Sequence, residues 1–542
     1  MQPSPTMAIA VPTIESKEFG FHDSTLLPKF MYRIPIVILL VTPLLLWSSS
    51  TTIISNSIVH ICISSRKLNH LYCLSAGAEP ASRSPNASSI SPGNSTGHAL
   101  IDHHFFGEDN PALPINKSSF FSNYKDEGVV TAVKHVEEQV QAHRSWASGA
   151  NDHVGCEGRG IFVYDLPSKF NKDLVAQCND MVPWTNLCEY FANEALGEQL
   201  PELGNGWYKT HQYSLEIIFH SRVLKHPCRV YDPNEAKLFY VPFYGGLDIL
   251  RWHFKNVTNQ VKDSLGQELV RWLDGRPPWV RNSGKDHVFV LGKVSWDFRR
   301  RGDSPWGTRL LELNQMQNPI KVLIERQPWH LNDVGVPHPT HFHPRSDADI
   351  IAWQLRIMRA DRRSLTGFAA GERPGLPENI RSLLIKHCIS AGEGKCRFLD
   401  CNSGDCAQPE SVIRLFMESE FCLQPPGDSP TRKSLFDSLV SGCIPVLFDP
   451  FTAYYQYPWH LPEEHGKYSV FIYQEEVREM KVDVVEKLMR ISVKEKEEMR
   501  RYIVYELLPG LVYGASDSRL EKFQDAFTIT MNNLLQRVSR LE

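Results

Sequence analysis

The sequence predicts an α/β fold of two Rossmann-like domains facing a cleft, preceded by a single transmembrane helix and a disordered stem. An apolar run near the N-terminus predicts the helix, and a stretch rich in Ser, Pro and Asn predicts the stem. From Gly158 onward, short β-rich runs alternate with helical segments, which is typical of parallel α/β sheets. The chain has 542 residues, too many for one ordinary hydrophobic core, so we expect two or three domains.

The apolar run covers residues 34–54. Its length of roughly 20 residues is what a membrane-spanning helix needs. Lys29 and Arg33 precede it, which favours a cytoplasmic N-terminus and a type II orientation. The alternative is a cleaved signal peptide, but its apolar core would be shorter and nearer the start of the chain. We therefore expect a cytoplasmic tail over 1–33 and a signal anchor over 34–54.

The segment after this run, residues 55–150, is expected to be a lumenal stem. Residues 81–96 are rich in Ser, Pro and Asn, and such a composition cannot build a packed core. Three N-glycosylation sequons cluster in the stem, and a fourth lies in the later globular region. We therefore expect a secretory-pathway lumen and glycans on four asparagines: Asn86, Asn94, Asn116 and Asn256.

The cysteines agree with that compartment. Ten of the 12 cysteines lie between Cys156 and Cys443. Four of them are close together and invite a zinc site, but they contain no C-x-x-C pair: Cys388, Cys396, Cys401 and Cys406. In an oxidising lumen, disulfides are the better interpretation of these residues. The sequence does not give their pairing.

The globular region divides after a loop rich in Pro and His at 336–344. We expect an N-terminal Rossmann-like domain over 151–345 and a second one over 346–515. The remaining residues, 516–542, are expected to form a C-terminal amphipathic helix, because apolar side chains recur there at helical spacing. The six strands expected in the two domains are short and apolar: Gly160–Tyr164, Lys237–Val241, His287–Leu291, Ile320–Ile324, Phe421–Leu423 and Ile444–Phe448.

The stretch Glu418–Pro450 predicts an anion-binding site, because it reads as strand, tight loop, helix and strand. Ser429 suits a helix N-cap and Pro430 the first helical position. Three free backbone N–H groups would then face the carboxyl end of a strand, and two of them belong to cations: Thr431, Arg432 and Lys433. Helix starts of this kind bind anions in the crevices of open α/β sheets.

The alternative is that Arg432 and Lys433 are solvated surface charges. Two cations at a helix N-terminus cost free energy unless an anion joins them, so this alternative is the weaker one. The anion is not a nucleic acid, because the net charge of −4, from 58 basic and 62 acidic residues, provides no global basic field.

At this stretch the sequence resembles the exostosin-type glycosyltransferase family, specifically its plant xyloglucan galactosyltransferase branch. The resemblance covers about Arg159–Phe471. It rests on six segments in order, of which the fifth, around the anion loop, is the most specific: IFVYDLP at 161–167, WYKTHQY at 207–213, AKLFYVPFY at 236–244, KDHVF at 285–289, FCLQPPGDSPTR at 421–432 and GCIPV at 442–446.

The resemblance implies a GT-B fold in which the N-terminal domain takes the acceptor and the C-terminal domain the nucleotide sugar. It implies an inverting transfer from a UDP-sugar, without metal or cofactor, in a type II Golgi membrane protein. In that branch, galactose usually passes from UDP-galactose to a xylose side chain of xyloglucan during hemicellulose synthesis. Alternatives are transfer of another sugar, such as galacturonic acid, and a catalytically silent, lectin-like scaffold. Xyloglucan, the Golgi membrane and other Golgi glycosyltransferases are the expected partners.

The residues expected to hold the donor are those of the anion loop, with Glu420 bonding the ribose hydroxyls: Gly427, Asp428, Ser429, Thr431, Arg432 and Lys433. An inverting transfer also needs a base that faces the donor's anomeric carbon, and this base should come from strand-end loops of the N-terminal domain. The candidates are Asp248, His211 and, ranked below them, Asp165. A turn residue, a satisfied core histidine and a helix cap are the plain alternatives.

One further motif resembles a metal site. Asp347-Ala-Asp349 matches the D-x-D pattern of metal-dependent transferases. The motif stands directly before an apolar helical segment, so helix capping explains its carboxylates more simply. We therefore expect no metal there.

Overall fold

The computed structural model describes residues 127–147, 158–183, 185–372 and 379–541, together with Cys156 and three short strands near the N-terminus. The chain separates into two units, Met1–Ser82 and Arg83–Glu542. The first unit contains an antiparallel sheet of β1 (Ile53–Ser55), β2 (Ile58–Ile63) and β3 (Tyr72–Gly77). The second unit contains everything else described below.

The expected membrane span falls almost wholly outside the described residues. Its last two residues, Ile53 and Ile54, belong to strand β1, so a helix over 34–54 is wrong at that end. Among the residues that the structure describes, no helix is long and apolar enough to cross a membrane. The sequons at Asn86, Asn94 and Asn116 also lie outside the described residues.

The first of two parallel sheets in the second unit has six strands, in the order β5-β4-β6-β7-β8-β9. Its strands are β4 (Gly160–Val163), β5 (Arg229–Val230), β6 (Ala236–Val241), β7 (His287–Val294), β8 (Ile320–Glu325) and β9 (Asp333–Gly335). Because both faces of the sheet are covered, its strands are apolar on both sides, as in Leu238, Phe239 and Tyr240.

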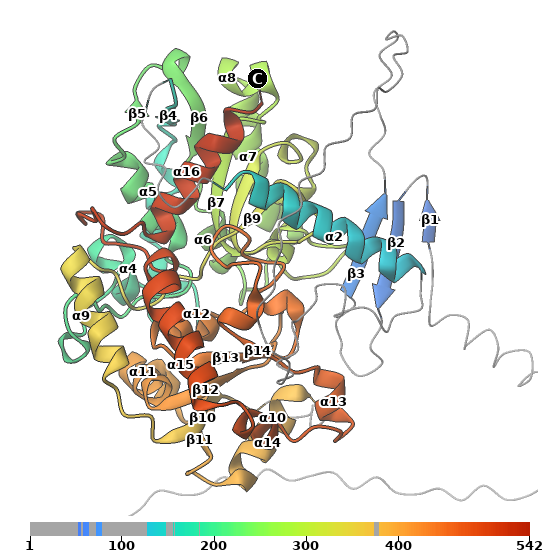
Figure 1. Cartoon of the computed structure of the whole chain (residues 1–542). Helices are drawn as coiled ribbons and strands as arrows, with labels where there is room; N and C mark the ends of the chain where they lie inside the picture. The colour runs from blue at the N-terminus through green and yellow to red at the C-terminus, as the bar shows by residue number, and fades with distance from the viewer. Residues whose placement is uncertain are drawn as a thin grey trace, which may run out of the picture. The chain divides into compact units, whose positions relative to one another are not determined.

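The second sheet has five parallel strands in the order β11-β10-β12-β13-β14. They are β10 (Ser364–Ala370), β11 (Cys396–Asp400), β12 (Ser419–Gln424), β13 (Ile444–Leu447) and β14 (Val470–Phe471). In Figure 1 the first sheet occupies the upper, green part of this unit and the second sheet the lower, orange part. All six strands expected from the sequence are present, and two parallel α/β sheets are confirmed.

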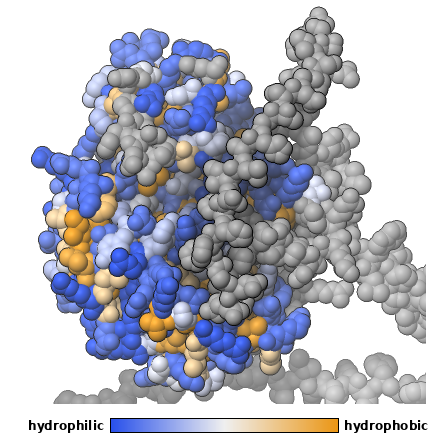
Figure 2. All heavy atoms as spheres, viewed as in Figure 1, coloured by the Kyte–Doolittle hydropathy of each residue, from blue (hydrophilic) through white to orange (hydrophobic). Residues whose placement is uncertain are grey.

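Helices cover both sheets. Around the first sheet they are α3 (Lys172–Val175), α4 (Cys188–Ala195), α5 (Leu215–Leu224), α6 (Gly245–Leu250), α7 (Asn259–Asp274) and α8 (Pro277–Asn282). The helices that follow in the chain are α9 (Asp347–Met358), α10 (Ile380–Ala391), α11 (Pro409–Met417), α12 (Lys433–Val440), α13 (Gln474–Arg478), α14 (Val484–Met489), α15 (Val493–Tyr502) and α16 (Ala526–Val538). On α9, Ile351 and Leu355 are exposed and form an apolar patch in Figure 2.

The last helix, α16, returns to the first sheet although it ends the chain (Figure 1). Phe527, Met531 and Leu535 pack in the same core cluster as the strands β6, β7 and β8. The helix begins at Ala526 rather than near Arg519, because Asp525 caps it: the Asp525 carboxylate accepts from the backbone N–H of Thr528 at 2.8 Å. The end of the chain therefore completes the core of the N-terminal sheet.

Helix α2 (Glu127–Ser145) lies inside the expected stem, so a disordered stem reaching residue 150 is wrong over these residues. Val136 and Val140, one helical turn apart, pack against Tyr455 in a separate small cluster. The Trp459 ring N–H donates to the His143 carbonyl at 2.8 Å. This apolar stripe is what makes the helix part of the globular unit.

The expected disulfides are confirmed. All ten cysteines from Cys156 to Cys443 pair: Cys156–Cys228, Cys178–Cys188, Cys388–Cys396, Cys401–Cys406 and Cys422–Cys443. The cluster that resembled a zinc site therefore consists of two short-range disulfides. The last pair joins β12 to the residue before β13, on either side of helix α12.

Asp525 should carry far more stability than an ordinary helix cap. It is fully buried and also receives the Arg222 guanidinium at 2.7 Å and the Gly514 N–H at 2.8 Å. Replacing it by Ala leaves the largely buried Arg222 with the Gly514 carbonyl and the Phe527 ring but no carboxylate, which costs about 3–5 kcal/mol. Asp483→Ala removes the exposed cap of α14 and should cost only about 1 kcal/mol. Thermal unfolding of both variants measures the difference, and equal losses would contradict this account.

Candidate donor-binding and catalytic site

Both sheets share one topology. Numbered along the chain within each sheet, the first five strands of the first sheet and all five of the second run in the order 2-1-3-4-5. In such sheets, ligands bind outside the carboxyl ends of the strands where the order reverses. In the second sheet that point lies between β10 and β12, and the loop after β12 is the predicted anion loop. The sheet topology thus supports the location inferred from the sequence.

The local geometry of the loop differs from the expectation. Helix α12 begins at Lys433, with Arg432 in the N-cap position and no side-chain cap, so Ser429 is not the cap. The reason is a carboxylate 106 residues earlier in the chain: Glu325 Oε2 accepts from the Thr431 N–H at 3.0 Å and from its hydroxyl at 2.6 Å. The N–H of Thr431 is therefore already bonded and does not face a ligand.

Glu325 ends strand β8 of the first sheet, so this bond joins the carboxyl ends of the two sheets. Both Glu325 and Thr431 are 5% exposed. Burial raises the pKa of Glu325, and hydrogen bonds from Thr431 and Ser429 partly offset that rise. A buried carboxyl held in this way fixes the anion loop against the other domain.

Arg432 lies directly over Gly427. A Cβ atom on Gly427 would stand 1.7 Å from Nη2 of Arg432, so no larger residue fits there without moving the guanidinium. The Gly427 N–H donates to the Ser429 carbonyl at 3.0 Å and closes the turn. The glycine is therefore needed because a charged side chain packs on its backbone.

Lys433, the first residue of α12, is a half-buried cation. Its ammonium is 2.7 Å from Asp437 Oδ2, one helical turn later. Burial lowers its pKa, and the attraction of Asp437 partly offsets this. An ammonium with one carboxylate partner, placed at a helix start beside a strand end, suits a phosphate group.

A second lysine approaches from the other sheet. Lys293, near the end of β7, is 3% exposed, lies 3.0 Å from Asp297 and stands over the Tyr213 ring at 4.5 Å. Burial lowers its pKa, but Asp297 and Tyr213 outweigh that effect, so the pKa is raised overall. Lys293 is a cation that sequence reasoning missed, since nothing local marks a lysine at the end of an apolar strand.

The charges of both lysines act on the pKa of His211. Burial, then Lys433, then Lys293 lower its pKa to about 3, so its ring is neutral at physiological pH. The Tyr213 N–H points at its Nδ1 at 3.3 Å, which leaves the proton of the neutral ring on Nε2. Lys433 is among the causes that lower the pKa of His211, whereas the causes acting on the pKa of Asp248 are burial, Arg251 and Asp263.

Three more histidines lie close enough to Lys433 for its charge to lower their pKa values. Burial comes first in each case, and Lys433 then lowers the pKa of His338 to about 3 and that of His341 well below its usual value. The pKa of His343 falls to about 4, with Lys433 one of the causes. All belong to the loop that was taken from the sequence as a domain boundary. This loop provides a neutral, polar lining next to a cation.

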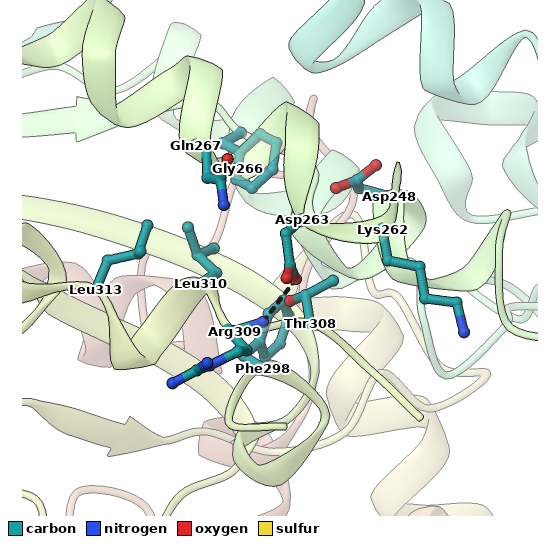
Figure 3. Close-up of a pocket in the computed structure, with 12 residues that line it drawn as sticks. Asp248, Lys262, Asp263, Gly266, Gln267, Phe298, Thr308, Arg309, Leu310 and Leu313 are labelled. Carbon is teal, nitrogen blue, oxygen red and sulfur yellow. Dashed lines mark hydrogen bonds between the residues drawn. The ribbon is translucent and has the colours of Figure 1, made fainter. Parts of the chain in front are cut away.

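The candidate base Asp248 lies apart from His211 and Lys433. It is 3% exposed on α6, and its Oδ1 accepts two bonds from Arg251, at 2.9 and 2.6 Å. Burial raises its pKa to about 6, with Asp263 contributing and Arg251 opposing. Figure 3 shows Asp248 in a pocket beside α7, where Asp263 accepts from the Arg309 N–H. Its partners are thus Arg251 and α7, and no described contact joins it to His211 or Lys433.

Asp165 follows β4 and is exposed. No contact in the described part of the chain joins it to either lysine, so the structure does not bring the three candidate bases together. Another buried carboxyl, Glu216 on α5, accepts from the N–H groups of Gly246 and Leu247 at 2.6 and 3.3 Å. Burial raises its pKa to about 8. Glu216 positions the loop after β6.

Glu420, expected from the sequence to bond the ribose hydroxyls, lies away from the anion loop. It stands at the start of β12, at the opposite end of the strand from the anion loop, and pairs with Arg500 of α15. The D-x-D motif is explained by capping: Asp349 forms a capping box with Ser346, and Asp347 accepts from three successive N–H groups, Glu521, Lys522 and Phe523. Asn256 is exposed just before α7.

Gly427→Ala should displace Arg432 and weaken anion binding. Losing one charge-assisted hydrogen bond corresponds to about a tenfold fall in affinity for UDP, measured by calorimetry on the full chain. Gly466→Ala is the matched control, because a Cβ there meets no atom within 4 Å. Equal UDP affinity in the two variants would show that the Gly427–Arg432 contact does not shape the site.

Several known proteins are similar in sequence to this chain. Residues 155–488 match the Exostosin GT47 domain. The chain is 49% identical to "Xyloglucan-specific galacturonosyltransferase 1" of Arabidopsis thaliana, over 94% of this chain and 90% of that protein. It is 51% identical to "Probable xyloglucan galactosyltransferase GT20" of the same plant, over 96% of each chain. It is 38% identical to "Xyloglucan galactosyltransferase MUR3", also from that plant, over 80% of this chain and 70% of that protein. The chain therefore belongs to the exostosin GT47 family and is a glycosyltransferase.

Proposed function

We propose that this enzyme transfers one sugar from a UDP-sugar to xyloglucan, with inversion, in a GT-B-type arrangement of its two domains. The observation that carries the proposal is Lys433, which stands at the start of α12 beside the strand-order reversal and acts on the pKa of His211 in the other domain. The relatives, whose names specify xyloglucan, support the acceptor. Five disulfides and an exposed sequon at Asn256 support a Golgi lumen as the setting.

The lysines act on the leaving group. As the glycosidic bond breaks, the departing UDP gains negative charge on its β-phosphate. A cation fixed near that phosphate stabilises the transition state more than the ground state. Lys433 and Arg432 provide this charge from the donor side, and Lys293 adds a positive field from the acceptor side. These side-chain cations then stabilise the negative charge of the leaving diphosphate, which other transferases stabilise with a divalent metal.

His211 is the base that we propose. It sits in the N-terminal domain and is partly exposed, whereas Asp248 is 3% exposed and bonded to Arg251. In the free enzyme burial lowers its pKa most, and both lysines lower it further. A bound diphosphate screens those charges, so its pKa rises and the ring becomes a better proton acceptor. The 3.3 Å bond from the Tyr213 N–H to Nδ1 is long, and its loss frees the tautomer that accepts at Nε2.

We propose galactose as the transferred sugar. A galacturonosyl donor would bring a third negative charge to the site. The two lysines are each already paired with a carboxylate, Lys293 with Asp297 and Lys433 with Asp437. Little positive charge is left to balance a uronate after the diphosphate has bound, which favours a neutral hexose. Galacturonic acid is the second candidate, because the galacturonosyltransferase relative is as similar to this chain as the galactosyltransferase one.

The donor and acceptor are tested together with the purified full chain. UDP-galactose and UDP-galacturonic acid are offered with xyloglucan, pectin and xylan oligosaccharides, and products are weighed by mass spectrometry. We expect one added galactose on xyloglucan fragments only, with the same rate in a chelator. Addition of galacturonic acid would correct the sugar. A silent scaffold would give no product and bind no UDP, and a ladder of lengths would indicate a processive enzyme.

His211→Gln should lower kcat by roughly a hundredfold or more, the usual contribution of a general base. UDP affinity should stay near that of the unmodified enzyme, because the change removes no charge. The falling rate at acid pH, where His211 becomes protonated, should also disappear. Asp248→Asn serves as the comparison, and a larger kcat loss there without a loss of stability would transfer the role of the base to Asp248.

A further inference from the structure

Two tryptophans form an exposed aromatic surface beyond the end of β7. Trp296 lies in the short turn Ser295–Phe298, and Trp306 in the loop that follows. Their rings are nearly parallel, at 15°, with centroids 5.9 Å apart. The Trp306 residue is 38% exposed, which is unusual for the largest apolar side chain. Neither ring belongs to a hydrophobic core cluster of the described residues.

The two tryptophans are held in place by Asp297, which forms an ion pair with Lys293. The ring N–H of Trp306 donates to Asp297 Oδ1 at 2.7 Å, while Asp297 Oδ2 lies 3.0 Å from Lys293. The backbone carbonyl of Asp297 also accepts the Thr308 N–H at 2.8 Å, which pins the base of the Trp306 loop. Two contacts and the electrostatic effect of Lys293 on His211 therefore connect this aromatic surface to the proposed base.

The surroundings of the pair are largely aromatic. The His253 ring packs edge-on against Trp306, and burial, then Lys293, lower its pKa to about 3, so it is neutral. Phe254 adds a ring that is 46% exposed. Lys262 lines the same pocket as Trp306. Exposed aromatic rings with polar neighbours suit a hydroxyl-rich ligand.

We propose that Trp296 and Trp306 bind the acceptor polysaccharide by stacking on its pyranose rings, next to the sugar that receives the transfer. The inference rests on the proposed function, since it takes the acceptor from there. The C–H faces of the sugars cover the exposed ring of Trp306 and the accessible part of Trp296.

The test uses acceptors of different length. In the unmodified enzyme a long xyloglucan oligosaccharide should have a lower KM than the shortest one that is modified, since more rings reach the tryptophans. In Trp296→Ala and Trp306→Ala this advantage of length should vanish, with the KM of the long acceptor rising about threefold to tenfold. UDP affinity should be unchanged. Trp306→Phe keeps a ring but loses the bond to Asp297, and it should retain most of the advantage.

Tyr231→Ala is the control, because Tyr231 is 78% exposed just after the edge strand β5, and no described contact joins it to this loop. An undiminished length advantage in both alanine variants would overturn the proposal. So would binding of phosphatidylcholine vesicles that is lost in the same variants, which would make the surface a lipid contact. If the unmodified chain binds UDP but modifies no acceptor, the proposed function has failed instead, and the two failures remain separate.

Discussion

The carboxyl of Glu325 is the constraint on which the site depends. It ends a strand of one sheet and accepts both the backbone and the hydroxyl of Thr431 in the loop of the other, with all of these groups buried. The loop cannot start its helix at Ser429 while Thr431 is held this way, so α12 begins at Lys433. The position of the donor-side cation therefore follows from a contact between domains. Losing a bond of this kind leaves a buried carboxyl unsatisfied, which costs more than the bond itself contributes.

The electrostatic character of the site follows from where its charges are buried. Two lysines from opposite sheets each keep one carboxylate partner, and four histidines near Lys433 are held neutral by burial and by its charge. In the free enzyme the positive and negative charges of these residues are thus nearly balanced, and the four histidine rings carry no charge. In the proposed mechanism, a bound diphosphate changes that balance. Substrate binding would then raise the pKa of the proposed base, His211, through charge alone.

Much of this could be predicted, and the failures share a cause. Apolar runs fixed by local composition gave the strands, and the turn residues of 425–430 located the anion loop beside β12. What local sequence does not contain is the distant partner. Glu325 accepts from Thr431 and so shifts the start of α12. Arg500 pairs with Glu420 at the end of β12 that lies away from the anion loop. Tyr455 provides the surface on which α2 packs. Trp296, Trp306 and Lys293 were missed because only the fold brings their ion pair and rings together.

The return of α16 to the first sheet affects how the chain is made. Residues 160–335 supply all strands of that sheet, yet Phe527, Met531 and Leu535 complete one face of its core. During synthesis the N-terminal domain stays incomplete until the ribosome has released nearly the whole chain. That face is an apolar surface exposed to chaperones in the meantime. The domains consequently cannot mature one after the other, and a nascent chain cut short before α16 leaves even the first of its two parallel sheets unfinished.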